Sequence, residues 1–262
     1  MSTEQRQEPE LTDEQILQFE QRIKDEEAQR IPLVCQAEPL SHLEEEYKDN
    51  EPFLRKVKNL NGDHQKIRKC RGDGNCFFRA FAFAWFESVL QKRSEYVTNL
   101  ATLKSTTDLL EMAGFQKLAY EDFYDVTLEQ FQQLPQWQGD TDLLLANFQS
   151  EEISNAIVMH LRFVTSAYLR MHADEYEPFL VVEMISIEEF CAMHVEAFGR
   201  ESDHLQITAL SNALNIPVQV IYLDGSNDDV AAVHEFWPSN TKTEKVNPLR
   251  LIYRPGHYDI LY

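Results

Sequence analysis

Residues 77–86 read Phe-Phe-Arg-Ala-Phe-Ala-Phe-Ala-Trp-Phe, which is apolar on nearly every side of a helix. A surface helix carries one apolar stripe, so a helix that is apolar all round must be covered on all sides. We therefore predict that residues 77–86 form the central helix of a domain. The 262 residues are 43% apolar and 11% aromatic, which is enough to build a core around such a helix.

Amphipathic helical patterns follow this stretch, and strand patterns follow the helices. Apolar residues recur at helical spacing over residues 95–112, 121–134, 140–148, 151–171, 187–195 and 203–214. The period then changes to two, which predicts strands over residues 216–222, 230–236, 249–253 and 257–262, with turns at 224–229 and 254–256. Because the helices precede the strands and do not alternate with them, we predict an α+β fold, rich in helices and with a small sheet.

The N-terminal segment differs in composition from the rest of the chain. Glu, Gln, Asp and Arg dominate residues 1–30, whereas residues 31–262 resemble a folded core, so we predict an arm and one larger domain. Thr12 and Gln15 fit a capping box at the start of a helix. A thin apolar stripe follows at Ile16, Phe19 and Ile23. The arm is therefore either partly helical and ordered on binding a partner, or a solvated tail.

The charge balance excludes whole classes of partner. The chain has 24 Lys and Arg residues against 44 Asp and Glu residues, so its net charge is −20. Such a chain repels nucleic-acid phosphates and anionic membrane surfaces, and it attracts proteins with a basic face. No stretch reaches the ~20 consecutive apolar residues of a membrane-spanning helix. We therefore expect no nucleic-acid partner and no membrane association.

The spacing of cysteine and histidine predicts neither disulfides nor a metal site. The cysteines at positions 35, 70, 76 and 191 form no Cys-x-x-Cys pair, and no His-Glu-x-x-His motif occurs. The first thirty residues lack the apolar segment of a secretory signal. We expect reduced thiols in the cytoplasm or nucleus, and no metal or other cofactor.

One cysteine follows a turn and opens the predicted central helix. Residues 73–76 read Asp-Gly-Asn-Cys, which places three strong turn formers directly before Cys76. In the first turn of a helix the backbone N–H groups lack intrahelical partners, and the helix dipole favours a thiolate. The N–H groups of Gly74, Asn75 and Cys76 could also bind an oxyanion. A small buried cysteine behind a turn is the alternative interpretation.

A histidine near residue 262 has the neighbours of a catalytic base. Residues 255–256 are Pro-Gly, so a turn leads His257 into a strand. Strand alternation then places His257 and Asp259 on one face and Tyr258 on the other. Asp259 could accept a hydrogen bond from one ring nitrogen while the other nitrogen faces a thiol. A His-x-Asp pair also occurs on ordinary surface strands, so the pattern becomes informative only together with Cys76.

The two motifs together resemble the ovarian-tumour (OTU) cysteine proteases, specifically the otubains. Residues 73–81 and 253–262 carry the resemblance, with further matching stretches at 32–34, 121–123, 161–166 and 201–204. The resemblance implies a papain-like OTU protease fold whose small sheet carries the catalytic histidine. It also implies four site residues: Asp73 as the active-site aspartate, Cys76 as nucleophile, His257 as general base and acid, and Asp259 as the residue that orients the ring. Some relatives have Asn at the last position, so Asp259 is typical of the otubain-1-like branch.

The resemblance implies a deubiquitinating cysteine protease that hydrolyses the isopeptide bond between the C-terminus of ubiquitin and a lysine. Members of this branch act on polyubiquitin and prefer lysine-forty-eight-linked chains. They also bind ubiquitin-charged E2 conjugating enzymes and inhibit them without catalysis, using the N-terminal arm. A non-catalytic protein that sequesters such E2 enzymes is therefore the alternative function, with Ile16, Phe19 and Ile23 facing the E2 or the proximal ubiquitin.

Residues 201–204 match a family surface that contacts the distal ubiquitin. The resemblance implies Glu201, Ser202 and His204 as ubiquitin contacts. From the residues alone, Ser202 or Asp203 before an apolar helical run is equally an N-cap.

Overall fold

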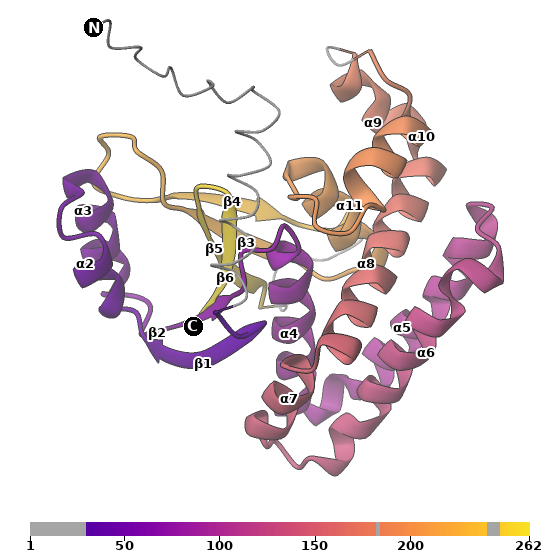
Figure 1. The fold of residues 1–262 in the computed structure, drawn as a ribbon, viewed down its shortest axis with the longest axis horizontal. Helices are drawn as coiled ribbons and strands as arrows, with labels where there is room; N and C mark the ends of the chain where they lie inside the picture. Colours follow the sequence, from indigo (N-terminus) through magenta and orange to yellow (C-terminus); the bar gives the residue numbers. More distant parts are fainter. Residues whose placement is uncertain (1–29, 182–183, 240–246) are drawn as a thin grey trace, which may run out of the picture.

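The computed structural model describes residues 30–181, 184–239 and 247–262 of the chain (Figure 1). The α-helices are α2(His42–Glu46), α3(Glu51–Leu60), α4(Cys76–Gln91), α5(Tyr96–Met112), α6(Lys117–Gln133), α7(Thr141–Phe148), α8(Glu151–Met171), α9(Ala173–Leu180), α10(Ile187–Phe190) and α11(His204–Leu214). The strands are β1(Val34–Pro39), β2(Lys66–Cys70), β3(Val218–Tyr222), β4(Ala232–Phe236), β5(Leu249–Arg254) and β6(His257–Leu261). A π-helical turn over Cys191–Val195 continues α10. The predicted arm, with Ile16, Phe19 and Ile23, lies outside the described residues.

The strands form one mixed sheet in the order β1-β2-β6-β5-β3-β4. Neighbouring strands are antiparallel except for β3 and β5, which are parallel. In the β5–β6 hairpin, Arg254 lies opposite His257 and Ile252 lies opposite Asp259. Because β6 has a neighbour on each side, it carries His257 and Asp259 in the interior of the sheet and not at its edge.

Helices cover both faces of the sheet (Figure 1). Successive side chains of the central strands alternate between two cores, as the strand pleat requires. Leu251 and Ile260 face the larger core around α4. Ile252 and Leu261 face a smaller core formed with α2 and α3. The predicted α+β class is confirmed, with a thick helical layer on one face of the sheet.

Helix α4 lies at the centre of the larger core, as its sequence predicts. Every side chain from Cys76 to Phe86 is buried. The helix packs against β5 and β6 on one side and against α7 and α8 on the other. Within this core the ring of Phe86 contacts the rings of Phe131 and Phe148 edge-on. Each fully buried aromatic side chain contributes about 1.5–3 kcal/mol of transfer free energy, so α4 gives Cys76 a rigid base.

The expectation that strands only follow the helices is wrong, because β1 precedes all the described helices and β2 precedes α4. The strand β2 contains a buried arginine, Arg68, which is only 4% exposed. Its guanidinium bonds to the hydroxyl of Tyr262 and pairs with Glu87, so tertiary contacts compensate its charge. A charged residue at a core position hides the hydrophobic alternation by which strands are recognised.

None of the described helices is long and apolar enough to span a membrane.

Candidate active site

The candidate nucleophile is the first residue of α4. Asn75 is the N-cap residue and Cys76 begins the helix, as the turn motif predicts. Cys76 is 3% exposed. The thiol therefore lies at the positive end of the helix dipole.

The carboxylate of Asp73 holds the loop before Cys76. Its Oδ1 accepts the backbone N–H of Asn75 at 2.9 Å, and its Oδ2 accepts a hydrogen bond from Nη2 of Arg79 at 2.5 Å. Arg79 is fully buried and also donates to Ser154 Oγ of α8 at 2.8 Å. The carboxylate thus fastens the loop to α4 and, through Arg79, to α8.

The contact between Asp73 and Asn75 corrects the expected oxyanion hole. A backbone N–H that already donates to a carboxylate is not free to stabilise an oxyanion. We therefore remove Asn75 from the expected donors. The N–H groups of Gly74 and Cys76 remain as candidates.

Asn75 contributes its side chain to the loop. The amide is fully buried, and its Oδ1 accepts hydrogen bonds from Nη2 of Arg162 at 2.8 Å and from the N–H of Gly199 at 2.9 Å. Arg162, on α8, also donates to three backbone carbonyls, those of Gly74 (3.0 Å), Val195 (2.9 Å) and Arg200 (2.6 Å). Arg162 therefore joins the cysteine loop to residues 195–200.

Burial lowers the pKa of Arg162 to about 10, so the guanidinium stays charged at neutral pH. Its charge interacts with Cys76 and Asp73. In the sequence, Arg162 follows Leu161 inside an amphipathic helix. A charged residue beside the apolar face of a helix is the one sequence signal that Arg162 could be buried and paired. Its partners could not be read from the sequence.

Gly74 allows the cysteine loop and the Gly199 segment to touch. Its φ is 74°, and a Cβ at this position would clash with the carbonyl oxygen of Gly199. A side chain at position 74 would therefore separate Asn75 from the N–H of Gly199.

We expect Gly74→Ala to lower thermal stability and to slow alkylation of Cys76 by iodoacetamide. A non-glycine residue at positive φ costs about 1–3 kcal/mol, and the clash with Gly199 adds to this cost. Gly114→Ala is the matched control, because Gly114 also has a positive φ of 86° but a Cβ there meets open space among the described residues. The two variants are compared by differential scanning fluorimetry and by alkylation rate. Equal effects would contradict the close contact.

The strand β6 places His257 and Asp259 on the same face, as predicted. Nε2 of His257 lies 2.7 Å from Oδ1 of Asp259, which leaves Nδ1 for the thiol. Burial alone would lower the pKa of His257, but hydrogen bonding and charge from Asp259 and Cys76 outweigh burial and raise it to about 10. An imidazolium at neutral pH stabilises a neighbouring thiolate and can protonate a leaving amine.

Asp259 is fully buried and accepts hydrogen bonds from three directions. Besides His257, Oδ1 accepts the backbone N–H of Cys70 at 2.9 Å. Oδ2 accepts from Nε of Arg254 at 3.0 Å and from Nη2 at 2.6 Å. Burial would raise the pKa of Asp259, but its hydrogen bond with His257 and the charge of Arg254 lower it. Sequence reasoning missed Arg254, although this residue lies three positions before His257.

A cavity of about 180 Å³ opens beside Cys76. Besides Cys76, its lining comes from segments that are far apart in the sequence: Glu201, Ser202 and Asp203, then Tyr222 of β3, and Tyr253, Gly256 and Tyr258 of the β5–β6 hairpin. The hydroxyl of Tyr258 donates to the carbonyl of Ser202 at 3.2 Å and so joins β6 to the segment of residues 201–203. The cavity gives a narrow approach to the nucleophile.

The residues predicted to contact ubiquitin differ in their exposure to solvent. Glu201 and His204 are exposed, and His204 bonds to Asp203 Oδ1 at 2.8 Å. Ser202 is only 7% exposed, so it does not belong to an exposed docking surface as expected. Its hydroxyl has no hydrogen-bond partner among the described residues, and it lines the cavity. Asp203 forms a capping box with Gln206, which confirms the N-cap alternative for Asp203.

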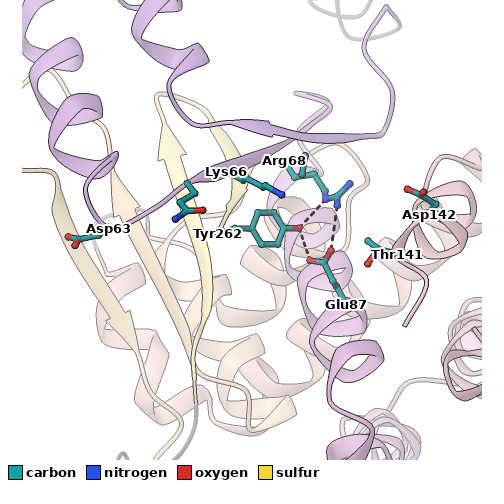
Figure 2. A pocket seen from close by; sticks show the side chains of 9 residues that line it. Asp63, Lys66, Arg68, Glu87, Thr141, Asp142 and Tyr262 are labelled. Carbon is teal, nitrogen blue, oxygen red and sulfur yellow. Dashed lines mark hydrogen bonds and ion pairs between the residues drawn. The ribbon is translucent and has the colours of Figure 1, made fainter. Parts of the chain in front are cut away.

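A larger cavity of about 570 Å³ lies away from Cys76 (Figure 2). In its wall, Nε of Arg68 donates to the hydroxyl of Tyr262 at 3.0 Å, and this hydroxyl donates to Glu87 at 2.6 Å. Burial raises the pKa of Glu87. The residues that line the cavity include no Cys, Ser or His. Their hydrogen bonds fasten the end of β6 to α4, which fixes the strand of His257 relative to the helix of Cys76.

Comparison with known proteins places this geometry in a family. The family model described as Peptidase C65 Otubain matches residues 26–262. "OVARIAN TUMOR DOMAIN-containing deubiquitinating enzyme 1" of Arabidopsis thaliana is 39% identical over 256 residues, which cover 92% of this chain and 84% of that protein. "Ubiquitin thioesterase OTUB1" of Homo sapiens is 36% identical over 251 residues, which cover 95% of this chain and 90% of that protein.

A solved structure described as "The structure of h/ceOTUB1-ubiquitin aldehyde-UBCH5B~Ub" matches the fold with a TM-score of 0.84 and 30% sequence identity. The match covers 95% of this chain and 97% of that chain. A second, described as "The structure of h/ceOTUB1-ubiquitin aldehyde-UBC13~Ub", has the same TM-score of 0.84 at 29% identity, over 95% of this chain and 98% of that chain.

Proposed function

The chain belongs to the otubain family, Peptidase C65, and is a cysteine-type deubiquitinating enzyme; from this premise we propose that it hydrolyses the isopeptide bonds of polyubiquitin. One observation supports the proposal above all. Cys76 begins a buried helix and lies beside His257, whose Nε2 bonds to the buried Asp259 at 2.7 Å, and the thiol borders a narrow cavity.

In the proposed reaction the Cys76 thiolate attacks the carbonyl carbon of the isopeptide bond. The N–H groups of Gly74 and Cys76 donate to the oxyanion. His257 transfers its proton to the lysine amine, the C–N bond breaks, and a thioester remains on Cys76. The neutral His257 then takes a proton from a water molecule that attacks the thioester. Ubiquitin leaves as a carboxylic acid, which ionises, and the thiolate–imidazolium pair is restored.

The test of this function is reaction with ubiquitin that carries a C-terminal electrophile. We expect a covalent adduct on Cys76 under reducing conditions, mapped by mass spectrometry of the peptide that contains residues 73–76. The same reagent should leave Cys76→Ala unlabelled. Labelling of Cys35, Cys70 or Cys191, or no labelling, would contradict the assignment.

We propose that the distal ubiquitin contacts Glu201 and His204 and extends its C-terminal tail into the cavity at Cys76. The exposure of Glu201 and His204 and the carboxylates of Glu201 and Asp203 at the cavity support this placement. We also propose a preference for lysine-forty-eight-linked chains, which the similarity to otubains supports. Cleavage of a panel of linkage-defined di-ubiquitins at equal concentration tests the preference, and equal rates for all linkages would contradict it.

The second candidate function is binding and inhibition of ubiquitin-charged E2 enzymes. The two similar solved structures, by their descriptions, contain ubiquitin aldehyde and the conjugates UBC13~Ub and UBCH5B~Ub together with OTUB1 chains. We propose that this protein shares such a partner and that its arm contributes through Ile16, Phe19 and Ile23.

Deletion of residues 1–30 separates the contribution of the arm from that of the catalytic domain. We expect thermal stability and cleavage of a minimal ubiquitin C-terminal substrate to change little, because the predicted arm is too poor in apolar residues to belong to the core. Di-ubiquitin cleavage and E2 inhibition should weaken about tenfold, which corresponds to about 1.4 kcal/mol of partner contact. The full-length and truncated proteins are compared in all three assays. Unfolding of the truncated protein would place the arm in the core, and no change in any assay would make it a passive tail.

A further inference from the structure

The carboxylate of Asp259 accepts hydrogen bonds from other groups besides His257. It is fully buried and accepts four: from Nε2 of His257, from the backbone N–H of Cys70, and from two nitrogens of Arg254. Among the described residues, Oδ1 accepts hydrogen bonds from His257 and Cys70, and Oδ2 accepts them from Arg254 alone. The guanidinium therefore holds the oxygen that is turned away from the ring.

A second carboxylate, that of Glu46, holds the other edge of the Arg254 guanidinium. It ends β5, opposite His257 in the register, and its side chain is 13% exposed. Its Nη1 donates to Glu46 Oε1 of α2 at 2.5 Å, and Glu46 in turn pairs with Lys69 at 3.1 Å. A planar guanidinium bound by carboxylates on two edges cannot rotate without breaking charge-assisted hydrogen bonds. Its position thus depends on α2 as well as on the sheet.

We propose that Arg254 is a positioning residue for the reaction: its two-point hydrogen bond to Oδ2 sets the plane of the Asp259 carboxylate, so that Oδ1 points at His257 Nε2 and Nδ1 points at Cys76. The inference rests on the proposed function, because its main assay is ubiquitin cleavage. Arg254 acts through Asp259 and not on the substrate, since the guanidinium lies behind the carboxylate.

Two cations contact the carboxylate of Asp259, the imidazolium of His257 on Oδ1 and the guanidinium of Arg254 on Oδ2. The charges of Arg254 and His257 lower the pKa of Asp259, whereas burial and this carboxylate raise the pKa of the Cys35 and Cys70 thiols. Without the guanidinium, the carboxylate would keep its bonds on Oδ1 only. It could then rotate about its Cβ–Cγ bond and let the imidazole turn with it.

The test compares kcat and KM of wild type and Arg254→Gln with a ubiquitin C-terminal fluorogenic substrate. We expect kcat to fall about 10- to 100-fold, because a small misplacement of a catalytic group lowers the rate by this much. KM should stay within about twofold, because the proposed ubiquitin contacts at Glu201 and His204 are unaltered. Arg250→Gln is the matched control, since Arg250 is exposed on the same strand. An unchanged kcat in Arg254→Gln, or an equal loss in Arg250→Gln, would overturn the proposal.

A double-mutant cycle separates positioning from general support of the fold. If Arg254 acts through the carboxylate, Arg254→Gln should cause no further loss of kcat once Asp259→Asn is present. Additive losses would show that Arg254 acts on something else, and the proposal would fail. Arg254→Lys keeps the charge without the two-point geometry, so its kcat should lie between those of wild type and Arg254→Gln. If Arg254→Gln does not fold, the lysine variant decides, and a wild-type kcat in it would overturn the proposal.

The rate at which iodoacetamide alkylates Cys76 reports on the position of Asp259 and His257 without a ubiquitin substrate. A wild-type protein that cleaves no ubiquitin substrate contradicts the proposed function, yet Arg254→Gln should still slow alkylation about as much as Asp259→Asn does. A wild-type protein that cleaves ubiquitin while Arg254→Gln alkylates and cleaves normally contradicts the inference alone.

Discussion

Cys76→Ala is expected to lower isopeptide cleavage by at least about 10³-fold while ubiquitin binding survives, because Cys76 is the one thiol among the residues that line the cavity. The fold should tolerate the change. Cys76 is a small side chain at the end of α4, and deletion of one buried sulfur costs on the order of 1 kcal/mol. Di-ubiquitin cleavage measures the first effect, and isothermal titration with ubiquitin measures the second.

The control for this variant is Cys35→Ala. Cys35 is a free, half-buried thiol on β1, so its replacement removes a sulfur from the molecule without touching the first turn of α4. It should keep full activity. Substantial cleavage by Cys76→Ala would show that the nucleophile is wrongly assigned, and loss of activity in Cys35→Ala would point to a second essential thiol.

Asp259→Asn is expected to lower kcat strongly, though less than His257→Ala, and to destabilise the fold. An asparagine oxygen can still accept the hydrogen bond of His257, but the amide lacks the charge that stabilises the imidazolium. Its NH2 group would have to face a donor, either Arg254 or the pair of His257 and Cys70. One buried unsatisfied donor costs about 1–3 kcal/mol, and more beside a charge.

Three measurements check this prediction: kcat for both variants, thermal denaturation, and an NMR titration of His257. In the wild type the ring should hold its proton until about pH 10. Without the carboxylate, the pKa of His257 should fall toward its ordinary value of about 6.5. Because the raised pKa of His257 adds stability, this contribution is complete below about pH 6.5 and is lost as the pH rises through about 10. An unchanged pKa in Asp259→Asn would show that Cys76 alone holds the proton.

The sequence by itself determined the parts of this protein that depend on neighbours along the chain. The apolar circumference of residues 77–86 required a buried helix, and α4 is buried over all of them. The turn residues before Cys76 set the start of that helix. The spacing of His257 and Asp259 placed both on one face of a strand, and the two side chains meet at 2.7 Å. Local geometry has a fixed period, so a local pattern is enough to predict it.

Only the tertiary structure decided which distant groups hold the site together. Arg162 reaches Gly74 across 88 positions of sequence, and Arg254 reaches Glu46 across 208. The buried Arg68 of β2 likewise pairs with Glu87 and bonds to Tyr262. The backbone N–H of Asn75 donates to Asp73, and its side-chain oxygen accepts the N–H of Gly199. A buried charge is stable only beside its partners. Those partners become neighbours only when the chain is folded, so no periodicity in the sequence predicts them.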